Sequence, residues 1–346
     1  MVKTDIKSLN LSELENLITE MGEPKFRASQ IFKWLQSGVG SFDEMTDISK
    51  KLREKLEDSC YIANLRIVRK LKSQIDGTVK YLYELHDGQT IESALMKYEH
   101  GYSLCISTQV GCRMGCSFCA TGLGGLVRDL TASEMLAQIT TAQNDENIRI
   151  SNVVMMGMGE PLDNFQSSVK FLELVSHEKG LNIGLRHISL STCGVVTGIE
   201  KLKEYNFPIT LSVSLHAPLD GIRSDMMPIN KKWNIDSLLK ACREYQHVTT
   251  RRISFEYALI EGVNDTKECA DLLAKKLKGI MCHINLIPVN PVKENSNKTP
   301  SKNKILKFKE WLTANGLNAT VRRTLGADIN ASCGQLRRRE QEGRKT

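Results

Sequence analysis

The sequence lacks any long apolar segment. No run approaches the roughly 18 apolar residues that a membrane-spanning helix needs, and the start, MVKTDIKSLNLSELENL, has no apolar stretch like that of a secretion signal. We therefore expect a cytoplasmic chain without a membrane anchor. Its 346 residues, 41% hydrophobic and 25% charged, suffice for one large soluble domain with a small appendage.

The chain also lacks the secretory context in which cysteines pair as disulfides. Its ten cysteines are expected to be reduced, and clustered cysteines in a reducing compartment indicate a metal site or catalysis. Acidic residues are outnumbered, since 47 Lys and Arg against 40 Asp and Glu give a net charge of +7. This balance permits a polyanionic partner, and it is equally compatible with a solvated basic surface.

Two kinds of secondary structure are expected before the main domain. Residues 1–60 read as helices with an apolar face, and Asn10 followed by Glu13 predicts an N-cap box. Residues 61–100 alternate as strands do around a His-Asp-Gly turn at 86–88, which predicts a β-hairpin that links to the main domain.

From about residue 104 onward, short apolar segments alternate with helical patterns. Strands are predicted at 104–108, 153–158, 187–191, 209–216, 253–258 and 284–289. Helices are predicted at 135–142, 169–175, 199–205, 235–245, 267–277 and 305–312. Six strand–helix units predict a parallel sheet with right-handed crossovers, hence a barrel or a doubly wound sheet.

Polar residues at alternating strand positions favour the barrel. In Ile209-Thr-Leu-Ser-Val-Ser-Leu-His216 the apolar side chains share one face and the polar ones the other, and the strands at 187–191 and 253–258 alternate likewise. A strand of a doubly wound sheet would be apolar on both faces. A closed eight-stranded barrel would fill its lumen with branched apolar side chains. We therefore predict an α/β fold with an open, partial (β/α)6 barrel of TIM type and a polar ligand in the lumen.

Three cysteines follow the first barrel strand in the sequence Cys112-Arg-Met-Gly-Cys116-Ser-Phe-Cys119. Barrel enzymes place their chemistry at this end of the strands. A structural zinc site needs four protein ligands, so a distant residue would have to complete one here. Three thiolates on a four-iron cluster instead leave one iron open to chelate S-adenosylmethionine (SAM). The spacing resembles that of the radical SAM superfamily.

A second motif, Gly157-Met-Gly-Glu-Pro161, ends the second predicted strand. Its glycines permit close approach of the backbone, and Glu160 can accept hydrogen bonds from an ammonium group. A glycine-rich turn with a capping acid is the plain structural alternative. In the superfamily the matching segment binds the methionine amino group of the cofactor.

Several separated motifs, which span essentially the whole chain, together resemble the RlmN family of RNA methyltransferases. They are Gln109-Val-Gly-Cys-Arg-Met-Gly-Cys-Ser-Phe-Cys-Ala120, Gly157-Met-Gly-Glu-Pro161, Leu215-His-Ala-Pro218, Met227-Pro-Ile-Asn230 and Ala331-Ser-Cys-Gly-Gln-Leu336. The resemblance implies formation of 2-methyladenosine in 23S rRNA, at the peptidyl-transferase centre, and in tRNA next to the anticodon. It implies SAM and a [4Fe-4S] cluster held by Cys112, Cys116 and Cys119.

The resemblance also implies a radical route, because adenine C2 lies between two nitrogens and is too electron-poor to attack a sulfonium methyl group. In the family, a cysteine that matches Cys333 is methylated first, and a 5′-deoxyadenosyl radical then takes a hydrogen from that methyl group. Cys105 matches the cysteine that helps release the RNA adduct and leaves a disulfide with Cys333. Glu92 matches the proton acceptor, although sequence alone leaves open whether Glu92 or Cys105 takes the C2 proton.

The cofactor contacts of the family can be transferred by position. They fall on Gly159, Glu160, Ser191, Ser214, Leu215, His216 and Asn290. The expected partners are 23S rRNA and tRNA, together with an electron donor such as flavodoxin or ferredoxin, and the chain is expected to be monomeric. Basic clusters near Cys333, such as Arg322 and Arg323, would hold RNA phosphates.

The sequence predicts four segments. They are a helical N-terminal domain at 1–60, a β-hairpin linker at 61–100, a radical SAM partial barrel at 101–333 and a basic C-terminal tail at 334–346. The first is a candidate for recognising RNA shape or a plain structural cap.

Three alternatives stay open at this point. A Cfr-type enzyme would methylate adenine C8 of the same rRNA nucleotide and shares the cluster loop and both cysteines. A radical enzyme acting on a small molecule or another protein would not need Cys105 and Cys333 together. A non-enzymatic RNA-binding module would hold zinc instead of iron.

Overall fold

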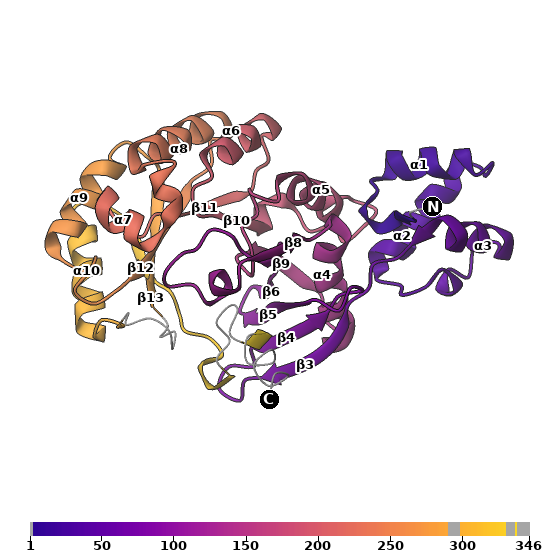
Figure 1. The fold of residues 1–346 in the computed structure, drawn as a ribbon, viewed down its shortest axis with the longest axis horizontal. Coiled ribbons are helices and arrows are strands. Elements are labelled where there is room, and N and C mark those ends of the chain that lie inside the picture. The colour runs from indigo at the N-terminus through magenta and orange to yellow at the C-terminus, as the bar shows by residue number, and fades with distance from the viewer. Residues whose placement is uncertain (1–2, 290–297, 330–335, 338–346) are drawn as a thin grey trace.

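The computed structural model describes residues 3–289, 298–329 and 336–337. The molecule is elongated, with a group of N-terminal helices at one end and a large α/β unit making up the rest (Figure 1). Within the described ranges, no helix combines the length and apolar character needed to cross a bilayer.

Three helices make up most of the N-terminal region: α1 (Leu11–Glu20), α2 (Phe26–Ser37) and α3 (Lys50–Ser59). The predicted cap box is present at the start of α1. The Asn10 side chain accepts the Glu13 N–H at 2.9 Å, and the Glu13 carboxylate accepts the Asn10 N–H at 2.7 Å. The short parallel strands β1 (Thr4–Asp5) and β2 (Cys60–Tyr61) bring the two ends of this region together.

A ten-stranded sheet forms the centre of the α/β unit. Its spatial order is β14-β13-β12-β11-β10-β9-β6-β5-β4-β3. The strands are β3 (Arg66–Lys72), β4 (Val79–Glu84), β5 (Thr90–Tyr98), β6 (Gly101–Cys105), β9 (Ile150–Met155), β10 (Ile188–Thr192), β11 (Thr210–Ser214), β12 (Ile253–Leu259), β13 (Cys282–Pro288) and β14 (Ala319–Val321). Neighbours from β6 to β14 pair in parallel.

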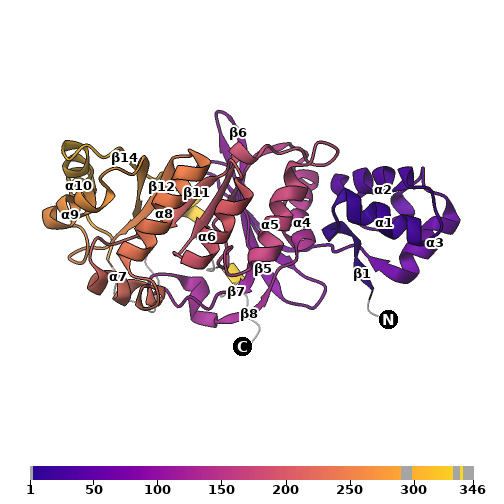
Figure 2. The ribbon, with the colours of Figure 1, turned by 90° about the horizontal axis from the view of Figure 1, so that it is seen from above.

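The six predicted strand–helix units are confirmed. A short additional helix after β11, α7 (Asp220–Met226), was not predicted. The helices of the six units are α4 (Ala132–Glu146), α5 (Phe165–Ser176), α6 (Val196–Tyr205), α8 (Ile235–Thr249), α9 (Lys267–Leu277) and α10 (Lys302–Ala314). They cover the outside of the curved sheet (Figure 2). The sheet has two edges, β14 and β3, so the barrel is open as predicted. The short seventh parallel strand, β14, was not predicted.

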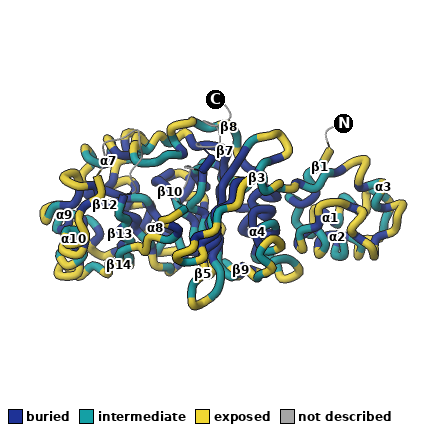
Figure 3. Tube along the Cα trace, turned by 90° about the horizontal axis from the view of Figure 1, so that it is seen from below, coloured by how far each residue is buried: buried dark blue, intermediate teal, exposed yellow. Residues whose placement is uncertain are grey.

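Alternating burial explains why these segments form strands of this barrel. The apolar side chains of Ile188, Leu190, Leu211 and Phe255 are at most 1% exposed, and removing each from water contributes about 2 kcal/mol. In Figure 3 the central strands are mostly dark blue, whereas the outer helices α9 and α10 include exposed, yellow segments.

The predicted hairpin is present as β4 and β5, which pair antiparallel around the turn at residues 86–88. The structure adds β3 as its third strand. All three strands continue the barrel sheet, because β5 pairs antiparallel with β6. The hairpin therefore forms one wall beside the barrel opening.

Candidate active site

A narrow hairpin of β7 (Gln109–Gly111) and β8 (Leu126–Asp129) closes the loop that carries the three cysteines. The Cys112 N–H donates to the Gly125 carbonyl at 2.9 Å. Gly111 has φ +82°, and a Cβ there would lie 2.0 Å from the Gly125 oxygen. Only glycine fits at position 111, so the close pairing of β7 with β8 at the base of the cysteine loop depends on it.

The three thiols of Cys112, Cys116 and Cys119 lie close together. Burial, together with the negative charges of the neighbouring Glu160 and Cys119, raises the pKa of the Cys112 thiol to about 12. Burial likewise raises the pKa of Cys116, with added repulsion from Cys119 and Cys112. Buried thiols become thiolates when a metal replaces the proton, so this donor set fits an iron–sulfur cluster. Within the described residues, no three His, Cys, Asp or Glu side chains converge on a point suited to one metal ion.

The glycine motif at 157–161 packs directly against the chain that leads into the cysteine loop. A Cβ on Gly157 would lie 2.5 Å from the Ile106 carbonyl oxygen, and one on Gly159, whose φ is +101°, would lie 2.7 Å from the Gln109 nitrogen. The Gln109 side chain accepts the Glu160 N–H at 2.8 Å. Close backbone contact therefore places Glu160 beside the cysteines, with which its charge interacts.

The Glu160 carboxylate is buried, with 3% of the residue exposed. One oxygen accepts the Cys193 N–H at 2.7 Å and the other accepts the Leu162 N–H at 3.1 Å. Burial raises the pKa of Glu160, while these N–H groups lower it. The side chains of Thr192 and Cys193 also contact the carboxylate. A carboxylate has about four acceptor positions, so an ammonium group is a chemically suitable further partner.

The predicted polar faces of the strands line up in rows across the sheet. Ser191 pairs with Ser212, which pairs with Ser254. Two positions further along both strands, Ser214 lies opposite Glu256. Because paired residues share a face, these side chains all point into the barrel. The row supplies hydroxyl and carboxylate groups to a polar ligand.

His216 lies two residues after the end of β11, and its ring contacts the cysteine loop. Its backbone is left-handed, with φ +58°, and its Nδ1 accepts the Ala258 N–H at 2.9 Å. Burial lowers the pKa of His216 to about 3, with Arg223 adding to the effect. The ring is therefore neutral and carries its proton on Nε2. Its centroid lies 4.9 Å from that of Phe118, between Cys116 and Cys119.

Glu92 lies in β5 and forms a buried ion pair. The Lys80 Nζ is 2.6 Å from one Glu92 oxygen, and both side chains are 2% exposed. The other oxygen accepts the Arg337 N–H at 2.5 Å. Cys105, buried in β6, pairs with Ala94, two residues along β5 from Glu92, so Glu92 and Cys105 lie on one face of the sheet. This face continues into the barrel lumen.

The last described residues reach this wall from far along the chain (Figure 1). The Asp328 carboxylate accepts the Ser73 hydroxyl at 2.7 Å and the Gln74 N–H at 2.9 Å. Arg337 meets Glu92 at the other end of the segment. Cys333 and Asn290, two predicted site residues, lie outside the described residues.

Residues 4–62 match the family model described as the ribosomal RNA large subunit methyltransferase N-terminal domain, and residues 106–275 match that of the radical SAM superfamily. A probable dual-specificity RNA methyltransferase RlmN from Alkaliphilus oremlandii is 54% identical over 98% of this chain and 99% of its own length. The same protein from Clostridium novyi is 52% identical over 96% of this chain and 98% of its own length. The chain belongs to the RlmN family.

A crystal structure of a radical SAM methyltransferase from Sphaerobacter thermophilus has a TM-score of 0.91 and 43% identity, over 96% of this chain and 98% of that one. RlmN membership confirms the predicted fold class and identifies the chain as a radical SAM methyltransferase. The cofactors of the family are a [4Fe-4S] cluster and SAM. The match favours the RlmN reaction over the Cfr-type alternative.

Four polar residues that support the RlmN site have roles that the sequence did not reveal. Lys80 pairs with Glu92, and Gln109 holds the Glu160 backbone. Asn264 binds the His216 carbonyl at 2.7 Å, and Arg223 is wholly buried beside the strand ends. Only Lys80 left a signal, as a charged residue within an apolar strand. The others act on main-chain atoms that are far away in sequence.

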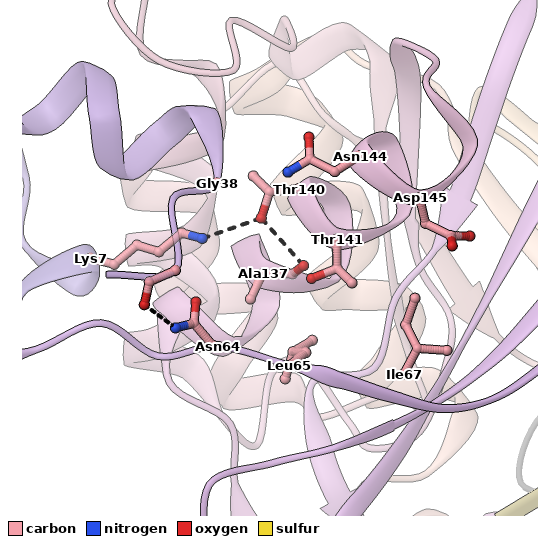
Figure 4. A pocket seen from close by; sticks show the side chains of 11 residues that line it. Lys7, Gly38, Asn64, Leu65, Ile67, Ala137, Thr140, Thr141, Asn144 and Asp145 are labelled. Atoms are coloured by element: carbon pink, nitrogen blue, oxygen red, sulfur yellow. Dashed lines mark hydrogen bonds between the residues drawn. The ribbon is translucent and has the colours of Figure 1, made fainter. Parts of the chain in front are cut away.

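A cavity of about 580 Å³ lies at the junction of the N-terminal region and α4 (Figure 4). The Lys7 ammonium projects there and donates to the Thr140 hydroxyl at 3.2 Å. Burial lowers the pKa of Lys7 to about 8. None of the predicted site residues in the described chain lines this cavity, so it is separate from the cysteine loop.

Proposed function

We propose that the chain methylates adenosine at C2 in 23S rRNA, at the peptidyl-transferase centre, and in tRNA next to the anticodon. The observation that carries this proposal is the 2.5 Å hydrogen bond from the Arg337 N–H to Glu92. It ties the segment four residues beyond Cys333 to the wall that bears Glu92 and Cys105. The names of the RlmN relatives, which describe dual-specificity RNA methyltransferases, support the substrate class.

Cys112, Cys116 and Cys119 are the proposed cluster ligands. When bound, the cluster supplies the electron that cleaves SAM to a 5′-deoxyadenosyl radical. Glu160 would receive the cofactor ammonium, with Gly159 leaving room for the backbone approach. The other proposed contacts are Ser191, Ser214, Leu215, His216 and Asn290. The inward row of Ser191 and Ser214 and the fixed, neutral His216 support this assignment.

Cys333 is the proposed methyl carrier. The 5′-deoxyadenosyl radical would take a hydrogen atom from its methyl thioether, and the resulting methylene radical would add to adenine C2. The adduct would then give up one electron to the oxidised cluster and its C2 proton to Glu92 or Cys105. Attack of the Cys105 thiolate on the Cys333 sulfur would break the bond from that sulfur to the transferred carbon, which takes up a proton to become the methyl group, and would leave a Cys105–Cys333 disulfide. The shared face of Glu92 and Cys105 supports their joint role. Whether Glu92 or Cys105 accepts the proton is tested by looking for trapped protein–RNA adduct in the Glu92→Gln variant.

Substrate binding is proposed to use the basic residues around the barrel opening. Arg322 and Arg323 are exposed just after β14, and Arg322 acts electrostatically on Glu256 inside the lumen. Phosphates held here would let an unpaired or flipped adenosine enter the barrel. The N-terminal region is proposed to recognise RNA shape.

The four-segment division at 1–60, 61–100, 101–333 and 334–346 stays a proposal, supported for the first segment by the β1–β2 pair that joins its ends. We also propose a cytoplasmic monomer that receives electrons from flavodoxin or ferredoxin. The reducing compartment that a cluster and reduced thiols require supports this placement.

The test is anaerobic reconstitution followed by reaction with SAM, a reductant and either a 23S rRNA fragment or tRNA. Mass spectrometry of the digested RNA is expected to find 2-methyladenosine in both. An 8-methyl product would select the Cfr-type reaction, and absence of any methylated adenosine would refute the proposal. Glu92→Gln assigns the proton acceptor, because Cys105 is still present to release the adduct: trapped protein–RNA adduct in this variant would identify Glu92, and normal turnover would identify Cys105.

A further inference from the structure

Arg223 in α7 is the largest fully buried side chain of the described residues, with 0% exposed. All of its hydrogen bonds end on neutral acceptors. Nε donates to the Leu215 carbonyl at 3.1 Å, Nη1 to the Asn230 side chain at 2.7 Å, and Nη2 to the Cys193 and Ser214 carbonyls at 2.7 and 3.0 Å. A buried cation is costly unless its donors are satisfied, and here main-chain oxygens satisfy most of them.

The guanidinium joins the ends of two neighbouring barrel strands. Ser214 ends β11 and Leu215 follows it, and Cys193 follows β10. The Cys193 N–H in turn donates to Glu160 at 2.7 Å. A Cβ on Gly194 would lie 3.0 Å from the Arg223 Nη2, so glycine there leaves space for the guanidinium. Arg223 thus fixes the end of β11 relative to Cys193, and through Cys193 relative to Glu160. All three segments are next to residues proposed to bind SAM.

Arg223 also donates a hydrogen bond to Asn230, the last residue of the Met227-Pro-Ile-Asn230 motif. Asn230 accepts from Arg223 and donates to the Asp220 carboxylate at 3.0 Å, which anchors the start of α7. At the end of α7, the Met226 carbonyl accepts the Ser117 N–H at 2.9 Å. Ser117 lies between two cysteines of the loop. The motif therefore couples Arg223 to the cysteine loop.

The charge of Arg223 also reaches the loop. The guanidinium and the Cys116 thiol lie close enough to interact electrostatically. A cluster with three thiolates is anionic and gains negative charge on reduction. A cation in a buried, low-dielectric position favours the more negative state.

We infer that Arg223 is a positioning residue that aligns the SAM-binding ends of β10 and β11 and stabilises the reduced form of the cluster. This inference rests on the proposed placement of cluster and SAM. The two roles can be tested separately. Lysine at position 223 would keep the positive charge but could not reproduce the hydrogen bonds of the planar guanidinium.

The test compares Arg223→Met, Arg223→Lys and Asn230→Ala in the full-length, anaerobically reconstituted protein, with the exposed Arg243→Met as the control. SAM affinity is measured by the change in the cluster's EPR signal, and the midpoint potential by an EPR-monitored redox titration. Loss of the charge-assisted contacts predicts at least about tenfold weaker SAM binding in both Arg223 variants. The potential is expected to shift to more negative values in Arg223→Met only. Asn230→Ala should weaken SAM binding less and keep the wild-type potential.

Wild-type SAM affinity and potential in Arg223→Met would overturn the inference. If that variant does not fold, unchanged SAM affinity in both Arg223→Lys and Asn230→Ala overturns it equally. A purely structural role would lower thermal stability without moving the potential or the affinity. If the wild-type protein binds cluster and SAM but methylates no RNA, the proposed function fails while this inference stands.

Discussion

The cysteine-loop region (Cys112, Cys116, Cys119, Glu160 and His216) and the Glu92 region (Glu92, Lys80, Cys105 and Arg337) are held in place by different interactions. Main-chain hydrogen bonds and glycines position the cysteine-loop region. Among the contacts of the Glu92 region are the buried Lys80–Glu92 ion pair and the Arg337 N–H. A cofactor site built on main-chain contacts tolerates few backbone changes, whereas the Glu92 region is sensitive to the identity of single side chains.

The largest effect is expected in the cysteine-loop region. Cys116→Ala should abolish cluster binding and SAM cleavage together, because two thiolates do not hold a cluster that needs three. Iron and sulfide analysis and assay of 5′-deoxyadenosine check this outcome. Cys60→Ala removes a buried cysteine of β2, in the N-terminal region, and should retain the cluster. A Cys116 variant that still binds about four irons per chain would contradict the ligand assignment.

Cys333→Ala should affect RNA methylation without affecting the cluster of the cysteine-loop region. RNA methylation is expected to be lost, because no sulfur remains to carry the methyl group, while cluster absorbance stays at the wild-type level. Mass spectrometry of the RNA and the visible spectrum of the protein measure the two effects. Cys282→Ala serves as the matched control. Unchanged methylation in Cys333→Ala would defeat the proposed mechanism.

Lys80→Met tests the ion pair of the Glu92 region. Removing one partner leaves a buried carboxylate uncompensated and should lower the free energy of unfolding by about 3–5 kcal/mol. Adding Glu92→Gln should recover much of this loss. Lys72→Met, at an exposed pair with Glu146, should cost less than about 1 kcal/mol. Denaturant unfolding measures all variants, and equal losses at the two sites would remove the distinction between the regions.

Gly159→Ala tests the main-chain design of the cysteine-loop region. Its Cβ would lie 2.6 Å from the Gln109 Cβ at a φ of +101°, which should cost about 1–3 kcal/mol and weaken SAM binding. Gly124→Ala, where no atom lies within 4 Å of the added carbon, is the control. Equilibrium binding of SAM to the reconstituted proteins compares them. Equal affinity in both variants would show that close backbone contact at Gly159 is dispensable.

Much of the molecule follows from local sequence patterns. The alternation at 209–216 predicted a strand with one polar face, because the strand period places every second residue on the same side. The cysteine spacing and the glycine motif predicted which loops meet at the barrel opening, since the carboxyl ends of parallel strands share one edge. Family motifs then identified the chemistry that the pattern alone left open.

Other features were decided only by the tertiary structure. The Lys80–Glu92 pair, the four hydrogen bonds of Arg223 and the contact of Arg337 with Glu92 join residues that no local period relates. A sequence states which side chain stands at a position, and its regular period states which face that side chain takes. It does not state which distant carbonyl or carboxylate will come to lie beside a buried charge, because that depends on how whole elements pack.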